Sequence, residues 1–548
     1  MLPSAVAARQ IVIGAVLSLA DSPAPQQGQG AIASERSSRR LSPLRVVIAI
    51  VVVLALAAAG YYGFRIAGAQ AAPKPQKWFA GYVDVTATPT YAFESAKEVR
   101  ARNVVLSFVV ADPDDACQPS WGAAYSLDAA AASLDLDRRI ARLEQRDGNV
   151  IVSFGGLANQ ELASACTDSA ELLAAYRSVV TRYDLTTIDL DIEAGSLTDA
   201  ASASRRADAI AALQKERRKA GSPLAVWLTL PVTPAGLSED GTNAVAAMLA
   251  AGVDVSGVNV MTMDYGASRT QGDSMAKASE KALTATHRQL GILYKQAGIS
   301  LGDASVWSKL GATPMVGQND EVGEVFSLAD AKALNAFARE NGVSRLSMWS
   351  LNRDATCGPN YVDLQVVSDA CSGIDQKGQT FVNALSKGYD GNPRASAGVV
   401  TTSEPTSAST ATDDPRTSPY PIWKATSAYL EGTKVVWHRN VYVAKWWSRG
   451  DVPDNPVLQE WSTPWTLLGP VLPGETPIPV PTLAPGTYPD WAGTAIYDKG
   501  DRVLFDGVPF ESKWWNQGAS PDAASADPDS SPWVALTQAQ IDQVEAGD

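Results

Sequence analysis

From Trp78 to Gly391, short apolar runs alternate with alanine-rich segments of helical periodicity, and no other pattern in the chain restricts the fold as strongly. Such a succession predicts parallel strands joined by helical crossovers. Eight units in about 310 residues predict an α/β fold, a (β/α)8 TIM barrel, with its functional face at the carboxyl ends of the strands. The expected strands are 79–85, 103–110, 149–156, 185–193, 223–230, 257–265, 308–317 and 344–351.

The fourth run carries three carboxylates at alternate positions, Asp189, Asp191 and Glu193. Because side chains alternate between the two faces of a strand, the acids point into the barrel and the aliphatic residues between them face the helices. Glu193 lies nearest the carboxyl end of the run. Three acids stacked on one interior face cannot all ionise cheaply, so we expect them to share a proton and Glu193 to stay protonated near neutral pH.

Catalysis explains these acids better than a structural role, because apolar side chains would stabilise a barrel core more. The alternatives are a solvent-exposed acidic strand and a divalent-metal site. The aliphatic residues on the opposite face disfavour the first, and the presence of only two histidines, His287 and His438, disfavours the second. A protonated carboxylic acid in a cleft is the group that a glycosidase uses to protonate a glycosidic oxygen.

The composition excludes other classes of function. A formal net charge of −14 leaves nothing to neutralise phosphates, so we expect no nucleic-acid partner. Two histidines also argue against a histidine-based catalytic triad.

Four motifs, in order, resemble those of glycoside hydrolase family 18, which contains the chitinases. Asp189–Glu193 (DLDIE) is similar to the catalytic DxDxE strand of that family. Ser153–Gly156 (SFGG) is similar to its SxGG motif, and Met261–Tyr265 (MTMDY) to its Met-x-x-Asp motif. Trp349, on the eighth expected strand, matches the tryptophan beneath the −1 sugar. The resemblance covers Trp78–Gly391.

This resemblance implies substrate-assisted, retaining hydrolysis of β-1,4-linked N-acetylglucosamine, with no cofactor and no metal. Glu193 would protonate the leaving oxygen, Asp191 would orient the acetamido group of the substrate, and Asp189 would modulate Asp191. The chain departs from the family at Thr186 and Met263, where an aspartate and a tyrosine are frequent. The resemblance also implies substrate-binding roles for Met261, Asp264, Tyr265, Trp349, Gln318, Ser153 and Gly155.

The composition changes after residue 420, where ten of the fifteen tryptophans occur. This tail contains a repeat, because residues from Tyr429 to Trp465 recur between Tyr497 and Trp533 at a constant offset of 68 residues. The repeat predicts two modules of roughly 50 residues joined by a proline-rich segment. Each module is too small to be an enzyme.

The two modules resemble carbohydrate-binding modules of families 5 and 12, small three-stranded domains found on chitinases. Flat aromatic rings stack on pyranose rings. Adjacent strand positions would turn one tryptophan of each Trp-Trp pair inward and the other outward. The resemblance implies chitin binding through Tyr429, Trp446, Trp447, Tyr497, Trp514 and Trp515.

Residues 46–64 contain no charged side chain and are long enough to span a bilayer. Arginines precede them, so the positive-inside rule places the amino terminus in the cytoplasm and the rest of the chain outside. The small residues Ala67-Gly68-Ala69 fit a signal peptidase site, so a cleaved signal and an uncleaved anchor both stay open. We expect an extracellular protein, secreted or anchored to the outer face of the plasma membrane.

The four cysteines are too few for a disulfide scaffold and lack zinc-type spacing. In an exported chain they can form two disulfides. We favour Cys117–Cys166 and Cys357–Cys371, because the second pair closes a short loop; the other two connectivities stay open.

Together these patterns predict a monomeric chitinase that binds chitin or chito-oligosaccharides, and the membrane if its amino-terminal helix is uncleaved. One alternative is a surface chitin-binding, lectin-like protein with an inactive barrel, although Glu193 is present. The other is an endo-β-N-acetylglucosaminidase, which would have little use for two chitin-type modules. The expected organisation is 1–45 disordered cytoplasmic segment, 46–64 transmembrane or signal-anchor helix, 65–77 linker, 78–391 barrel, 392–419 Ser/Thr/Pro linker, 420–468 first module, 469–487 Pro-rich linker and 488–537 second module.

Overall fold

A computed structural model describes residues 76–95, 99–359, 366–393, 412–476, 482–521 and 531–547 of the chain. Among these residues no helix has the length and apolarity that a membrane crossing requires. The helix expected at 46–64 lies outside the described residues, as does part of each expected linker.

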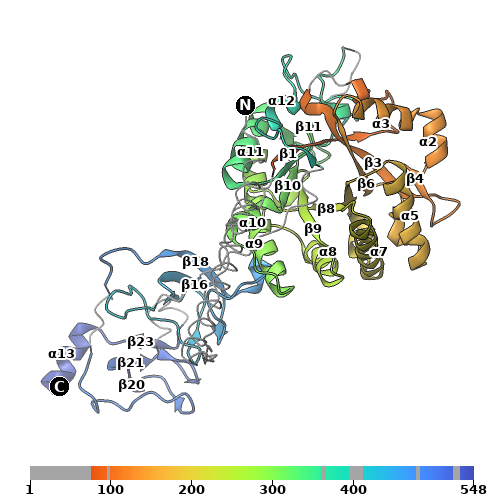
Figure 1. Cartoon of the computed structure of the whole chain (residues 1–548). Coiled ribbons are helices and arrows are strands. Elements are labelled where there is room, and N and C mark those ends of the chain that lie inside the picture. Colours follow the sequence, from red (N-terminus) through yellow and green to blue (C-terminus); the bar gives the residue numbers. More distant parts are fainter. Residues whose placement is uncertain are drawn as a thin grey trace, which may run out of the picture. The chain divides into compact units, whose positions relative to one another are not determined.

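The barrel strands pair in parallel around a closed ring (Figure 1). The first expected strand is interrupted at Ala80 into β1 and β2; β1 pairs with β13 and β2 with β3, which closes the sheet. The prediction of eight parallel strands is therefore confirmed, although the last two strands are shorter than expected. The strands are β1 (Trp78–Phe79), β2 (Gly81–Asp84), β3 (Asn103–Ala111), β6 (Asn149–Gly155), β7 (Thr187–Asp191), β8 (Ala225–Pro231), β9 (Val255–Met261), β10 (Leu310–Thr313) and β13 (Arg345–Leu346).

Helices on the outside of the ring begin at side-chain caps encoded in the sequence. Asp168 accepts the backbone N–H groups of Ala170 and Glu171 at the start of α5. Ser327 and Asp330 form a reciprocal capping box at the start of α11. The helices are α2 (Leu127–Ser133), α3 (Leu136–Glu144), α4 (Leu162–Ala165), α5 (Ser169–Arg182), α6 (Ala194–Thr198), α7 (Ala200–Lys219), α8 (Glu239–Ala250), α9 (Met275–Gln296), α10 (Asp303–Ser308), α11 (Leu328–Asn341) and α12 (Phe381–Leu385).

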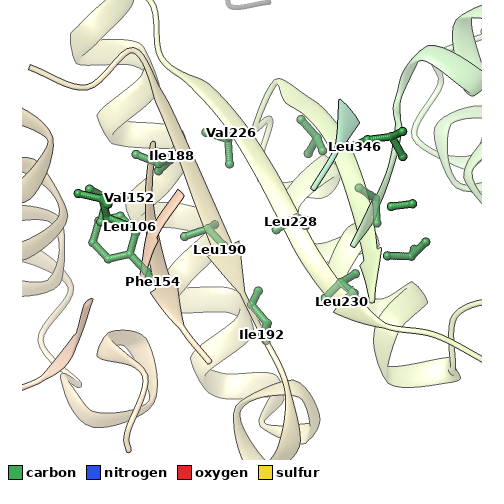
Figure 2. Packing of buried hydrophobic residues seen from close by; sticks show 14 of the residues in the cluster. Leu106, Val152, Phe154, Ile188, Leu190, Ile192, Val226, Leu228, Leu230 and Leu346 are labelled. Atoms are coloured by element: carbon green, nitrogen blue, oxygen red, sulfur yellow. The ribbon is translucent and has the colours of Figure 1, made fainter. Parts of the chain in front are cut away.

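The barrel has two apolar layers, one on each face of its sheet. Figure 2 shows part of the outer layer, in which Ile188, Leu190 and Ile192 point away from the barrel axis. The inner layer is smaller and aromatic: Trp78, Ala80, Tyr82, Val105, Ile151 and Trp227. The alternation expected for the acidic strand is confirmed, because its aliphatic residues lie in the outer layer.

Two disulfides lie on the barrel, Cys117–Cys166 and Cys357–Cys371. Both favoured pairings are confirmed. An antiparallel extension of the sheet, β4 (Pro119–Trp121) and β5 (Tyr125–Ser126), follows Cys117.

The carboxyl-terminal repeat is also a structural repeat. Each copy has a three-stranded antiparallel sheet and a two-stranded sheet, and equivalent strands start 68 residues apart, as 434 and 502 show. The first copy contains β14 (Ala428–Tyr429), β15 (Lys434–Trp437), β16 (Asn440–Ala444), β17 (Ser448–Arg449) and β18 (Trp465–Pro470). The second contains β19 (Ile496–Tyr497), β20 (Arg502–Phe505), β21 (Val508–Ser512), β22 (Asn516–Gln517) and β23 (Trp533–Ala535), followed by α13 (Gln538–Ala546).

Candidate active site

A pocket opens at the carboxyl ends of the barrel strands and contains five of the ten barrel residues predicted to act in catalysis or substrate binding. These five are Asp191, Glu193, Met261, Asp264 and Trp349. Its position agrees with the expected functional face of a parallel barrel. The remaining lining residues are Tyr82, Asp84, Thr86, Phe108, Gly122, Leu157, Ala158, Asn159, Thr229, Met263, Thr313, Met315, Asp320 and Asp369.

The three carboxylates lie at increasing heights along β7 and just beyond it. Asp189 is fully buried beside Ser153 of β6 and Trp227 of β8. Asp191, 4% exposed, lies one step higher, next to Gly155 and Thr229. Glu193 follows the end of the strand at the amino terminus of α6, half-buried in the pocket.

Asp189 is the best-satisfied of the three acids. Its Oδ2 accepts hydrogen bonds from Tyr82 Oη and Ser153 Oγ, each at 2.8 Å. Its Oδ1 accepts hydrogen bonds from Thr229 Oγ1 at 2.8 Å and from Arg345 Nη1 at 2.6 Å. The buried guanidinium of Arg345 neutralises Asp189, and nothing in the sequence indicated this counter-ion.

Asp191 and Glu193 have no such counter-ion in contact within the part of the chain that the structure describes. Burial, followed by the charges of Glu193 and Asp189, raises the pKa of Asp191 well above its usual value. One of its oxygens, Oδ1, is buried without a hydrogen-bond partner among the described residues. Burial and the charge of Asp264 raise the pKa of Glu193 to about 7. Near neutral pH, Glu193 can therefore hold and release a proton beside an unsatisfied carboxylate oxygen.

Asp264 is held in the pocket by the segment that follows β11 (Gly317–Gln318). Its Oδ1 accepts the backbone N–H groups of Asp320 at 2.8 Å and Glu321 at 3.1 Å. Burial nevertheless raises the pKa of Asp264. This aspartate is therefore fixed in position close enough to influence Glu193.

Aromatic rings line the same pocket as the acids. Trp349 stacks on Phe108 with ring centroids 5.5 Å apart and planes 21° apart. Tyr82 lies 6.1 Å from Trp349 in a tilted arrangement. These rings provide an apolar surface that can receive the face of a sugar ring.

The other predicted residues support the pocket without lining it. Ser153 donates to Asp189 rather than facing the pocket. A Cβ on Gly155 would lie 2.0 Å from the carbonyl oxygen of Asp191, so its glycine allows β6 and β7 to approach. The hydroxyl of Tyr265 donates to Ser279 of α9, and that ring points away from the pocket. Gln318 lies on β11 (Gly317–Gln318), against Gly373.

Three further residues of the site were not predicted from the sequence: Tyr82, Phe108 and Arg345. For Tyr82 a signal exists, because alternation from the outward-facing Phe79 and Val83 turns Tyr82 inward. Arg345 is the first residue of β13, 156 residues after Asp189, and no local pattern links the two.

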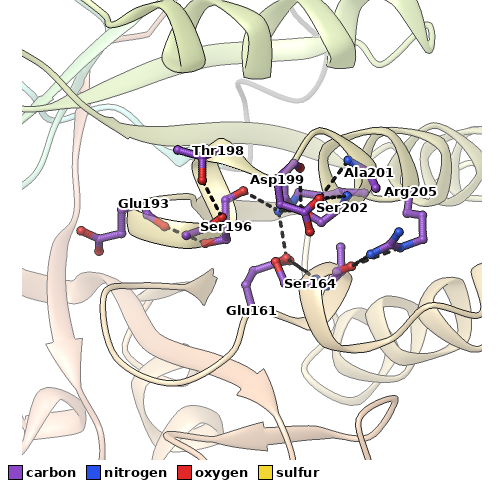
Figure 3. A network of polar contacts seen from close by, with 12 residues as sticks. Glu161, Ser164, Glu193, Ser196, Thr198, Asp199, Ala201, Ser202 and Arg205 are labelled. Carbon is purple, nitrogen blue, oxygen red and sulfur yellow. Dashed lines mark hydrogen bonds and ion pairs between the residues drawn. The ribbon is translucent and has the colours of Figure 1, made fainter.

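The backbone around Glu193 is fastened to the first turns of α6 and α7. Ser196 Oγ donates to the carbonyl oxygen of Glu193 at 2.7 Å, and Asp199 caps α7. Figure 3 shows the Glu193 side chain pointing away from these contacts. Beneath them, Arg206 and Glu161 form an ion pair of 2.9 Å in which both side chains are 1% exposed. Burial alone would raise the pKa of Glu161, but Arg206 and hydrogen bonds lower it below its usual value.

In the two carboxyl-terminal modules, the predicted sugar-binding aromatics divide into two groups. Trp446 and Trp447 are 40% and 59% exposed, and Trp514 and Trp515 are 45% and 59% exposed. The expectation that one of each pair faces inward is wrong, because each pair lies in a bend between two short strands instead of within a strand.

Tyr429 and Tyr497 belong to the module cores. Each is buried and packs edge-on against a tryptophan, Trp465 and Trp533 respectively. An exposed aromatic that the sequence analysis missed is Trp461, which is 62% exposed in the first module. Lys445 lies between Trp461 and the Trp446–Trp447 pair. Its Nζ donates to the carbonyl oxygen of Glu460, next to Trp461, and lies 4.9 Å from the centroid of the Trp446 ring.

No protein-family model matches the chain. The chain is 34% identical over 293 residues to the probable bifunctional chitinase/lysozyme of Escherichia coli K12, which covers 52% of this chain and 32% of that protein. It is 34% identical over 292 residues to endochitinase 11 of Metarhizium anisopliae, which covers 51% of this chain and 53% of that protein. The chain thus spans about a third and about half of these curated relatives. The solved catalytic domain of a hyperthermophilic chitinase from Pyrococcus furiosus aligns with a TM-score of 0.50 and 28% identity, over 59% of this chain and 98% of that chain.

Proposed function

We propose that the chain is a chitinase, a glycoside hydrolase that cleaves β-1,4 linkages between N-acetylglucosamine units. The observation that carries this proposal is the pair Asp191 and Glu193 in the barrel pocket. Glu193 keeps a proton up to about pH 7 and lies beside a buried carboxylate with an unsatisfied oxygen. The similarity to three chitinases over more than half of the chain supports the same reaction.

In this proposal Glu193 protonates the glycosidic oxygen, and the bond from that oxygen to the anomeric carbon breaks as the acetamido oxygen of the substrate attacks the anomeric carbon. Asp191 accepts the acetamido N–H and balances the positive charge of the resulting oxazolinium ion. Glu193, now a carboxylate, removes a proton from the water that opens this ion and restores the configuration. Trp349 stacks beneath the sugar, while Met261 and Asp264 form the wall beside it.

We also propose that the two modules bind chitin through Trp446, Trp447, Trp514 and Trp515. Their exposure supports this role, since a soluble protein rarely exposes adjacent large aromatics without a partner. Two modules on one chain would raise the apparent affinity for an insoluble polymer through effective concentration. Two disulfides fit an extracellular location, where thiols oxidise.

The test compares the parent chain with the Glu193→Gln variant on colloidal chitin, measuring soluble N-acetylglucosamine oligomers. Glu340→Gln is the matched control, because Glu340 is exposed on α11. We expect release by the parent and by Glu340→Gln, and no release by Glu193→Gln, with all three sedimenting with chitin. Turnover by Glu193→Gln would refute the mechanism. A parent that binds chitin without releasing sugar would favour the lectin-like alternative.

A further inference from the structure

Among the described residues of the barrel interior, one side chain is cationic. Arg345, at the start of β13, is fully buried. Its Nη1 donates to Asp189 at 2.6 Å, and its Nη2 donates to Tyr82 Oη at 3.0 Å. The guanidinium carbon is 5.3 Å from the ring centroids of both Trp78 and Trp227. Arg345 is thus packed among aromatic rings, and its three guanidinium nitrogens donate to Asp189, Tyr82 and Ser347.

This cation completes the set of donors around Asp189. Each carboxylate oxygen already accepts two hydrogen bonds, from Tyr82, Ser153, Thr229 and Arg345. A carboxylate that accepts four donors has no free lone pair for a proton. Asp189 therefore serves as a fixed anion, and a proton shared along the acidic strand has to be held by Asp191 or Glu193.

The charges that face Asp191 come from few elements. Asp189 and Glu193 lie on or next to its own strand, Arg345 faces it from β13, and the neutral phenol of Tyr82 faces it from β2. Asp264, from the end of β9, acts on the neighbouring Glu193. The Arg345–Asp189 ion pair is therefore the main fixed charge distribution next to Asp191 and Glu193.

We propose that Arg345 is a positioning residue of the reaction, which fixes Asp189 as an anion and thereby confines the mobile proton to Asp191 and Glu193. This inference rests on the proposed hydrolase function. A purely structural explanation is weaker, because replacing a buried ion pair by apolar side chains is often neutral or stabilising. The pair is instead directly beneath the only two acids of the strand that lack a counter-ion in contact among the described residues.

The two charges of the pair have opposite effects on Asp191, which makes the inference testable. Arg345 lowers the pKa of Asp191, and Asp189 raises it by more. In Arg345→Met, Asp189 loses its counter-ion and takes up the proton, so both charges that face Asp191 disappear. Because Asp189 is the stronger of the two, Asp191 should ionise more easily and the acid limb of the kcat–pH profile should move downward. Asp189→Asn/Arg345→Met removes both charges and should move the acid limb downward.

The experiment measures kcat and KM against pH on a soluble chito-oligosaccharide, together with thermal unfolding of each variant. Arg345→Lys keeps the positive charge and should retain the parental acid limb. Arg206→Met removes another buried arginine, paired with Glu161 outside the pocket, and should lower thermal stability without moving the limb. If Arg345→Met does not fold, the uncharged double variant carries the test. Folded variants with the parental acid limb would overturn the inference.

A second readout separates this inference from the proposed function. In a Glu193→Gln background, Asp191 and Asp264 are the acids with a raised pKa that still line the pocket, and Arg345 acts on Asp191. Calorimetry of chito-oligosaccharide binding against pH, compared with and without Arg345→Met, therefore reports on Asp191 without turnover. Adding Arg345→Met should lower the midpoint of that pH dependence, because Asp189 then takes up the proton, and an unchanged midpoint would contradict the role of Arg345. An inactive parent whose binding midpoint still moves would refute the hydrolase proposal, and with it the role of Arg345 in the reaction, while showing that Arg345 controls the proton on Asp191.

Discussion

Replacing Gly155 with alanine should separate the acidic strand from its neighbour. At this position φ is +104°, and the new Cβ would lie 2.0 Å from the carbonyl oxygen of Asp191. Since ordinary carbon contacts lie at about 3.5 Å, β6 and β7 would have to part by roughly 1.5 Å. Strained backbone in this region costs on the order of 1–3 kcal/mol, and overpacking adds a similar amount. We therefore expect a loss of about 3–5 kcal/mol in the free energy of unfolding.

Two glycines of the same barrel serve as matched controls. Gly252 also has a positive φ, +80°, but a Cβ there would meet nothing within 4 Å. Gly195, two residues after Glu193, has neither a strained φ nor a neighbour within 4 Å. Gly252→Ala should thus lose only about 1 kcal/mol, and Gly195→Ala should be close to neutral.

The assay combines calorimetric unfolding of the full chain with kcat on a soluble chito-oligosaccharide. For Gly155→Ala we expect the barrel transition to fall by about 5–10 °C and kcat to fall by about tenfold or more, because the carbonyl that moves belongs to Asp191. Both variants strain a backbone of positive φ, so the difference between their melting temperatures measures the contact of the new Cβ with the Asp191 carbonyl oxygen. Equal melting temperatures and similar kcat values for these two variants would refute the reasoning.

Three further predictions concern charge and exposed rings. Hydrolysis should decline as pH rises through about 7, where Glu193 loses its proton. Because folding raises the pKa of Glu193, ionising this group above pH 7 destabilises the folded chain. In denaturant unfolding, Glu193→Gln should therefore stabilise the chain by about 2–3 kcal/mol more at pH 8 than at pH 4. Glu161→Gln breaks a buried ion pair and should lower the free energy of unfolding by about 3 kcal/mol. Glu216→Gln breaks an ion pair with Arg177 whose side chains are 43–47% exposed, and should lower it by less than about 1 kcal/mol. Equal losses would contradict the role of burial. Trp447→Ala/Trp515→Ala should lower adsorption to chitin at least about fivefold while hydrolysis of soluble oligomers stays unchanged.

The sequence predicted the barrel and the inward direction of its acids because both depend on local periodicity. Alternation along 188–193 decides which side chains face the axis, and the closed ring of β7 with its neighbours follows from the number of units. The register that places Gly155 opposite Asp191 is a consequence of the same alternation on adjacent strands.

The remaining features depend on contacts between distant residues or on short irregular segments. Arg345 reaches Asp189 across the barrel, so the neutralised acid could not be recognised from its own strand. Tyr265 follows β9, in a turn where alternation no longer holds, and its hydroxyl turns to Ser279. The inward direction predicted for one tryptophan of each pair was wrong for the same reason, because Trp446 and Trp447 lie in a bend where strand alternation does not apply.

The Cys357–Cys371 bridge has a practical consequence for producing this protein. Asp369, which lines the pocket, lies within the loop that this bridge closes, two residues before Cys371. Chain produced in a reducing cytosol would carry the three acids unchanged but would lack the covalent tie on this part of the pocket wall, worth about 3 kcal/mol for a loop of this length. Preparations from reducing and oxidising hosts should therefore share a barrel and differ in their affinity for long oligosaccharides, so the choice of host belongs among the variables of any kinetic comparison.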